Sequence, residues 1–238
     1  MNYKALLLFA ILAIAGVLLA GIVAADPVNP TTVTSGTSSR GNVDGTSQNA
    51  SAQAGNVTRL DISAYQLTKS WQGYFGNLTG DLLLSDGSNN RLYNWSLTSP
   101  SGEVYASRNS SITWATVNCS NSTQVTLEET ALGHSASDGD SVTNTFGSTS
   151  HPWFLLGSNN ITGCKSVTLN NASGEQTSMF WNVLLSDNAD STVYTTILEN
   201  GASGFNAEAV DFELIVGEDG HGDAASSVTP YYFWVELS

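Results

Sequence analysis

The chain has 238 residues, with 21 acidic and seven basic side chains and a net charge of −14. It therefore lacks the basic surface that nucleic-acid binding requires, and an anionic membrane surface or acidic polymer would repel it. Eight Phe, eight Tyr and six Trp residues suffice for a hydrophobic core, and two cysteines alone are too few for a zinc site.

Residues 1–25 have the layout of an export segment. Lys4 supplies a positive end, residues 5–25 carry no charge, and the small residues 23–25 precede Asp26. This order is typical of a secretory signal peptide. The apolar run is also about as long as a bilayer core requires, roughly 20 residues. We expect an extracellular or cell-surface protein whose residues 1–25 are either cleaved or retained as a membrane anchor, with membrane contact only in the second case.

Two regions follow the export segment. Residues 26–57 are rich in Ser, Thr, Gly and Asn and contain almost no large apolar side chain. Such a segment cannot bury enough surface to offset its ordering entropy, so we expect a disordered stalk. Residues 58–238 have the length of a single β domain.

Within residues 58–238, the hydrophobic period is two. Alternating patterns at 93–97, 210–216 and 231–237 predict half-buried strands, and the nearly continuous apolar run at 179–185 predicts a central strand. No amphipathic helix is expected after residue 25. The fold class is therefore all-β, an antiparallel β-sandwich. As an edge strand, 231–237 would offer a surface for self-association.

A faint internal repeat relates residues 83–97 to residues 184–198. Leu-Leu-Ser-Asp at 83–86 recurs at 184–187, and Tyr93 recurs at Tyr194 with the same offset. The repeat indicates either two equivalent hairpins or a chance recurrence of residues that are common in β proteins.

The cysteines and the Asn-x-Ser/Thr triplets agree with export. Cys119 and Cys164 form an even pair and predict one disulfide, although two separate buried thiols remain an alternative. Closing a loop of this length stabilises the fold by roughly 4 kcal/mol. N-glycosylation is expected at some of nine sites, with Asn94 and Asn118 the least suitable by context. The nine are Asn49, Asn56, Asn77, Asn94, Asn109, Asn118, Asn121, Asn160 and Asn171.

No catalytic constellation is evident in the sequence. Residues 133–137 begin like a nucleophile elbow, but Ser137 stands where glycine is required. His151 and His221 are isolated, and Glu128, Glu129 and Glu175 have no defined separation as glycosidase carboxylates. We therefore predict no catalytic residue and expect that the protein is not an enzyme.

Calcium is the one cofactor that the sequence suggests. Glu218, Asp219 and Asp223 place carboxylates on a glycine-rich loop, and Asp138 and Asp140 do so on a smaller scale. Neither loop has EF-hand spacing, so each is alternatively a solvated acidic turn. Binding at the first loop is expected to be millimolar or absent.

Aromatic side chains offer a second kind of site, because exposed rings can stack on sugars. Each ring is alternatively part of the core, and the sequence does not identify the carbohydrate-contacting residues. The candidates are Trp71, Tyr74, Trp114, Trp153, Trp181 and Trp234.

The W-x-G-Y-x-G-N-x-T-G segment at residues 71–80, followed by Leu-Tyr-Asn-Trp at 92–95, resembles exported archaeal surface proteins of unassigned function. The resemblance covers residues 65–119 and 231–237. It implies an archaeal surface location and brings no catalytic residue.

Two functions are therefore expected. The first is a structural or adhesive component of the cell envelope that contacts copies of itself or other envelope proteins. The alternative is an extracellular module that binds a carbohydrate or another ligand. A secreted hydrolase is the third hypothesis.

Overall fold

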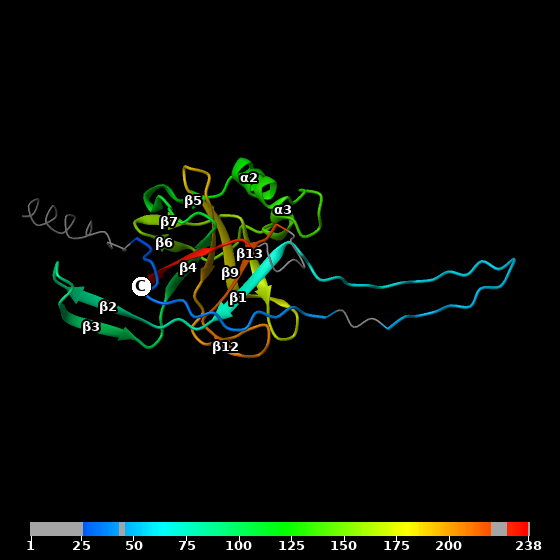
Figure 1. Ribbon diagram of the computed structural model, residues 1–238, viewed down its shortest axis with the longest axis horizontal. Coiled ribbons are helices and arrows are strands. Elements are labelled where there is room, and N and C mark those ends of the chain that lie inside the picture. Colours follow the sequence, from blue (N-terminus) through cyan, green and yellow to red (C-terminus); the bar gives the residue numbers. More distant parts are fainter. Residues whose placement is uncertain (1–25, 43–45, 220–227, 238) are drawn as a thin grey trace, which may run out of the picture.

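The computed structural model describes residues 26–42, 46–219 and 228–237 (Figure 1). Among these residues, 36% lie in strands and 9% in helices, and the strands pair in antiparallel fashion. The antiparallel β class predicted from the sequence is confirmed. Residues 1–25, the predicted signal peptide or anchor, lie outside the described residues. None of the helices in the described ranges is long and apolar enough to cross a membrane.

The body is built on one six-stranded sheet. Its strands run in the order β14-β4-β10-β9-β5, and β8 also pairs with β9. β9 lies inside this sheet and is buried over its second half, as the apolar run at 179–185 predicted. The six strands are β4 (Gly102–Ser107), β5 (Asn118–Cys119), β8 (Ser166–Asn170), β9 (Gln176–Ser186), β10 (Thr192–Ile197) and β14 (Tyr232–Leu237).

Four two-stranded sheets surround the central one. They pair β1 (Trp71–Gly76) with β13 (Phe212–Gly217), β2 (Gly80–Ser85) with β3 (Arg91–Leu97), β6 (Phe154–Leu156) with β7 (Asn159–Ile161), and β11 (Ala202–Ser203) with β12 (Ala209–Val210). The remaining elements are the 3-10 turn η1 (Trp114–Thr116) and the helices α2 (Ser122–Leu132) and α3 (Val142–Thr145).

The central sheet is covered on both faces, because its side chains alternate with a period of two. On one face, Tyr105, Val183 and Trp234 pack against the β6–β7 hairpin. The disulfide between Cys119 and Cys164, predicted from the sequence, closes this side of the core. On the other face, Ala106, Leu184 and Tyr194 pack against α2, α3, Phe146 and β13.

Helices α2 and α3 follow residue 25, although no amphipathic helix was expected there. Helix α2 begins at a capping box. The side chain of Asn121 accepts the backbone N–H of Gln124, and the side chain of Gln124 accepts the backbone N–H of Asn121. It ends at Gly133 in the left-handed conformation. The residues buried along it are Val125, Glu128, Glu129 and Leu132. These four residues have the spacing of one helix face. Because two of them are glutamates, the sequence shows no apolar stripe at this position.

The N-terminal part of the predicted stalk contacts the body. The backbone N–H and C=O groups of Val28 both bond to those of Val235, at 2.9 Å each. The outer edge of β14 is therefore paired at that point, and Trp234 and Val235 are buried. The edge proposed from the sequence for self-association is not an open one at Val235.

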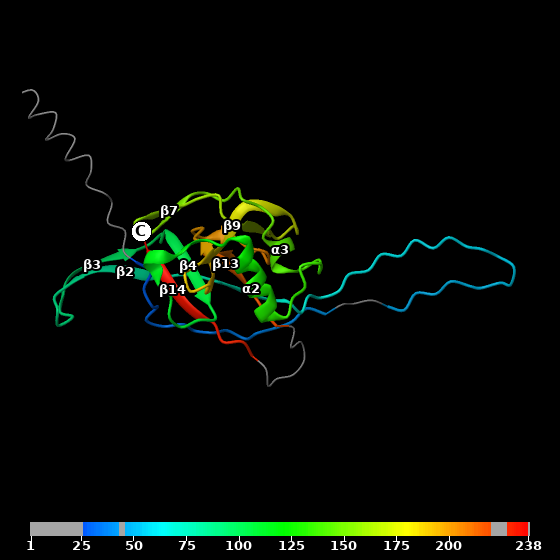
Figure 2. The same cartoon turned by 90° about the horizontal axis from the view of Figure 1, so that it is seen from above.

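Residues 46–66 form an extended segment without helix or strand that runs away from the body and returns to it (Figure 1). A hydrogen bond from the Asn56 N–H to the Gln53 carbonyl turns the chain at its tip. The β2–β3 hairpin projects from the opposite end of the body, and both views agree on this (Figures 1 and 2). We call these two features the extended segment and the arm.

Candidate functional site

The arm (residues 80–97) exposes several large apolar side chains to solvent. Its strands pair with each other and with no other strand in the described part of the chain. Leu84 is 48% exposed, Tyr93 58% and Trp95 50%. A free two-stranded hairpin is at best marginally stable in water, and a contiguous exposed apolar patch marks an interaction site.

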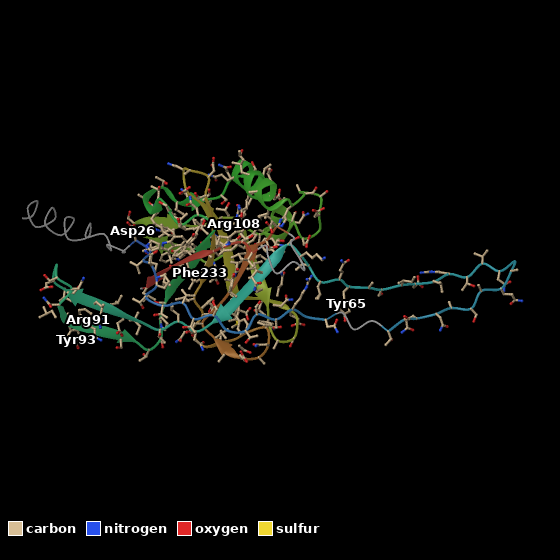
Figure 3. The ribbon with its side chains drawn as sticks, in the orientation of Figure 1. Asp26, Tyr65, Arg91, Tyr93, Arg108 and Phe233 are labelled. Atoms are coloured by element: carbon tan, nitrogen blue, oxygen red, sulfur yellow. A yellow bond between two sulfur atoms is a disulfide. The ribbon has the colours of Figure 1, made fainter. Side chains whose placement is uncertain are left out.

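The register of the arm separates two unlike faces. Leu82 lies opposite Trp95, and Leu84 lies opposite Tyr93, so these four side chains share one face. The rings of Tyr93 and Trp95 contact each other edge to face at 4.9 Å. The other face carries the pairs Asp81–Ser96 and Leu83–Asn94. The first face is thus apolar and the second is mixed, because Leu83 is 47% exposed there. Figure 3 shows Tyr93 and Arg91 on the arm, away from the body.

A second uncovered apolar surface is a groove over the outer face of β1 and β13. Leu214 and Val216 of β13 are buried in the core. Of their neighbours, Ile215 is half-buried against the same core, and Glu213 is buried and accepts the N–H of Phe205 at 2.7 Å. The groove measures about 940 Å³, and residues 37–41 form one wall. Phe75 and Phe205, 45% and 50% exposed, contact each other there at a centroid distance of 5.1 Å. We call this feature the β1 groove.

The remaining polar clusters of the body are internal to the fold. Glu128 of α2 accepts hydrogen bonds from Arg108 at 2.5 Å and from the Tyr194 hydroxyl at 3.0 Å. This carboxylate is buried, and the Arg108 head group compensates its charge. Burial, followed by the charge of Glu128, raises the pKa of Tyr194 well above its usual value, so the phenol stays protonated. The cluster holds α2 to the sheet.

The three carboxylates considered for hydrolysis have separate partners. Glu128 binds Arg108, and Glu129 accepts the backbone N–H of Thr143 at 2.7 Å. Glu175 lies exposed in the turn between β8 and β9. The hydroxyl of Ser137 lies 2.7 Å from that of Ser135 rather than beside a histidine.

In the two loops considered for calcium, Asp138, Asp140 and Glu218 accept hydrogen bonds from protein groups. Asp138 accepts the backbone N–H of Ser135, and Asp140 accepts the hydroxyl of Thr68. The Thr68 bond, as the largest cause, lowers the pKa of Asp140. Glu218 accepts the hydroxyl of Thr229 at 3.2 Å, and Asp223 lies outside the described residues. Within the described ranges, no group of three or more His, Cys, Asp or Glu side chains has the arrangement of a metal site.

Most candidate sugar-binding rings belong to the core. Trp71 donates its ring N–H to the Asp140 carbonyl at 2.7 Å, and Trp114 packs edge-on against Trp234 at 5.4 Å. Tyr74 packs against Phe233. Trp181 is half-buried, whereas Trp153 is 66% exposed. Trp95 was not among the candidates, although its alternation with Tyr93 was noted as a strand pattern.

The glycosylation candidates are at the surface. Eight of the nine asparagines are exposed, and the ninth, Asn171, is half-buried because its side chain accepts two backbone N–H groups of its own turn. Asn94 is exposed on the mixed face of the arm, opposite Leu83. A glycan there would leave the face carrying Tyr93 and Trp95 uncovered.

Comparison with known proteins adds no assignment. No protein-family model matches the chain, no curated protein matches its sequence, and no solved structure matches its fold.

Proposed function

We propose that this protein is an exported structural or adhesive component of the cell envelope, a β-sandwich-type domain that associates through the arm with copies of itself. The observation that carries the proposal is the apolar face made by Leu82, Leu84, Tyr93 and Trp95 on a projecting hairpin. Tyr and Trp side chains that an interface buries are typical anchors of protein association.

The internal repeat gives independent support. The arm and the β9–β10 hairpin share the Leu-Leu-Ser-Asp pattern, and both are antiparallel hairpins. In β9–β10 the corresponding residues Leu184, Leu185 and Tyr194 are buried in the core. The arm therefore carries a sequence suited to burial but has no partner in the described part of the chain, which a second molecule would supply.

Two other observations favour an extracellular setting. The disulfide indicates an oxidising, non-cytoplasmic environment. The exposed Asn-x-Ser/Thr sites are accessible to a glycosylation machinery. The archaeal surface location implied by the resemblance at residues 71–80 belongs to the same proposal.

The test is sedimentation velocity of the chain from residue 26 onward, oxidised, over a hundredfold range of concentration. The native chain should form dimers or larger species, and the variant Tyr93→Ser/Trp95→Ser should sediment as a monomer. The control Asn94→Gln/Ser96→Thr changes the opposite face of the same strand and should behave like the native chain. Circular dichroism checks that each variant folds. A native chain that is monomeric throughout, or a control that dissociates equally, would contradict the proposal.

A carbohydrate-binding role is the second candidate, because Trp153 and Trp95 are exposed rings. Screening the native chain and the variants Trp153→Ala and Trp95→Ala on a glycan array tests it. Binding that one of these variants loses would establish this role instead. Absence of binding by the native chain would exclude it for the sugars displayed.

A further inference from the structure

The edge of β1 that faces away from β13 has backbone groups available for a further strand. The carbonyls of Ser70 and Gly76 accept the N–H groups of Glu218 and Asp211, so both carbonyls point toward β13. Because carbonyl direction alternates along a strand, the carbonyls of the odd-numbered residues point away from β13. Among the described strands, β1 pairs with β13 alone.

The side-chain amide of Gln72 partly covers this edge. It donates to the carbonyl of Gly73 at 2.6 Å, in the position that a partner strand would occupy. Apart from its chain neighbours Gln72 and Tyr74, a Cβ atom at Gly73 would meet no atom within 4 Å. The edge of β1 and the β1 groove are therefore adjacent surfaces for a further strand. The edge supplies backbone hydrogen-bonding groups, and the groove supplies the rings of Phe75 and Phe205.

The same chain contains a strand-like sequence without a partner. In the extended segment, Leu60, Ile62 and Ala64 alternate with Arg59, Asp61 and Ser63. Leu60 is 58% exposed and Ile62 83%, and this part of the chain is in neither a helix nor a strand. Arg59 and Asp61 pair at 2.9 Å, so the segment would bring no net charge to an interface of this acidic protein.

Contacts at the base of the extended segment direct it away from its own groove. The hydroxyl of Thr68 donates to Asp140 at 2.5 Å and accepts the N–H of Ser70 at 3.1 Å. To pair with β1 of the same molecule, the chain would have to reverse within these residues. Figure 3 shows Tyr65 outward of the body on this segment.

From these relationships we infer that residues 59–65 of one molecule add as a strand to the free edge of β1 in a second molecule and fill its β1 groove. Leu60, Ile62 and Ala64 face the groove, and the backbone completes a three-stranded sheet with β1 and β13. Donor and acceptor are different surfaces, so the contact is heterologous and links subunits head to tail, into a ring or an open chain. The inference rests on the proposed function and specifies a contact in addition to the arm.

Cysteine cross-linking between two differently labelled chains tests the contact. Chains carrying Leu60→Cys, Asp61→Cys, Ile62→Cys or Ser63→Cys are each mixed with a Gly73→Cys chain and mildly oxidised. Directly opposite β residues have Cα atoms about 4.5–5.5 Å apart, which is within the Cα separation that a disulfide spans. Positions 60 and 62 should cross-link at least tenfold more than positions 61 and 63. The control acceptor is Gly87→Cys at the tip of the arm, where a Cβ is equally unobstructed.

Three outcomes would overturn the inference. The first is no cross-linked heterodimer at any position, and the second is equal yields at odd and even positions or with Gly87→Cys. The third is an intramolecular bond in the Ile62→Cys/Gly73→Cys double variant at a dilution where mixed chains do not react. If sedimentation shows arm-dependent association while these cross-links fail, the proposed function stands and this contact falls. Mass spectrometry confirms in each sample that Cys119–Cys164 is intact.

Discussion

Glu103 of β4 lies directly opposite Glu236 of β14 in the antiparallel register, and both side chains are buried. Glu236 accepts the hydroxyl of Tyr105 and the N–H of Gly157, each at 3.0 Å. Desolvation, followed by the negative charge of Glu236, raises the pKa of Glu103 to about 8. Desolvation also raises the pKa of Glu236. The pair therefore retains a proton at neutral pH.

This pair should make the stability of the fold depend on pH. The folded-state pKa of Glu103, about 8, lies above its usual 4.5, so folding takes up a proton between these values and stability falls as pH rises through this window. We expect Glu103→Gln to exceed the native chain in stability by roughly 2 kcal/mol at pH 8, and by much less at pH 4.5. Urea unfolding at both pH values measures the difference.

The control for this prediction is Glu208→Gln, which changes an exposed glutamate. It should leave the pH profile of unfolding as it is in the native chain. An advantage of Glu103→Gln that grows toward low pH would show that the carboxyl pair is ionised in the folded protein.

Removing Arg108 should be far more damaging than removing an exposed arginine. Arg108→Ala leaves the buried carboxylate of Glu128 without its cation, which costs roughly 3–5 kcal/mol. The control Arg59→Ala breaks a pair whose side chains are 86% and 78% exposed, so its effect should stay below about 1 kcal/mol. Urea unfolding of both variants at pH 7 tests this, and equal effects would show that the Glu128 site is solvated.

The strands at 93–97, 179–185 and 231–237 were predictable from their apolar patterns, but the prediction that 93–97 is half-buried is wrong, because β3 belongs to the exposed arm. The alternation at 231–237 and the apolar run at 179–185 correspond to β14 and to the buried half of β9. At 210–216, the pattern is interrupted at Asp211, whose carboxylate accepts the N–H groups of Leu78 and Gly201. That carboxylate divides the predicted strand into β12 and β13.

The features that sequence reasoning missed depend on long-range contacts. The pairing of Val28 with Val235 joins residues at opposite ends of the chain, within a polar segment that has no strand pattern. The burial of Glu128 depends on hydrogen bonds from Arg108 and Tyr194, which lie far from it in the sequence. The two hairpins of the internal repeat exist, but the pattern did not indicate that one lies in the core and the other projects.

The cap of α2 allows the effect of a glycan to be separated from that of a hydrogen bond, because Asn121 is both the N-cap and a glycosylation candidate. Asn121→Ala removes both and should cost about 1 kcal/mol, whereas Asn121→Ser keeps a capping oxygen and should cost only a few tenths. Thermal unfolding of unglycosylated protein measures the cap alone. Equal losses for the two variants in that material would contradict the assigned capping role.

Gly102 of β4 lies close to the backbone of β14. Its φ is +125°, a conformation that favours glycine, and a Cβ there would lie 2.0 Å from the carbonyl oxygen of Glu236. Gly102→Ala must therefore separate the two strands beside the buried Glu103–Glu236 pair, and we expect a loss of roughly 3 kcal/mol or more.

The matched control is Gly73→Ala in β1, where an added Cβ meets no atom within 4 Å. Because glycine in a strand interior is itself unfavourable by roughly 0.5–1 kcal/mol, this variant should be as stable as the native chain or slightly more so. Urea unfolding of both variants, followed by tryptophan fluorescence, gives the comparison. Trp234 lies in β14 and Trp71 in β1, so the signal reports on both strands. If Gly102→Ala unfolded at the native urea midpoint, the close contact with Glu236 would not exist in solution.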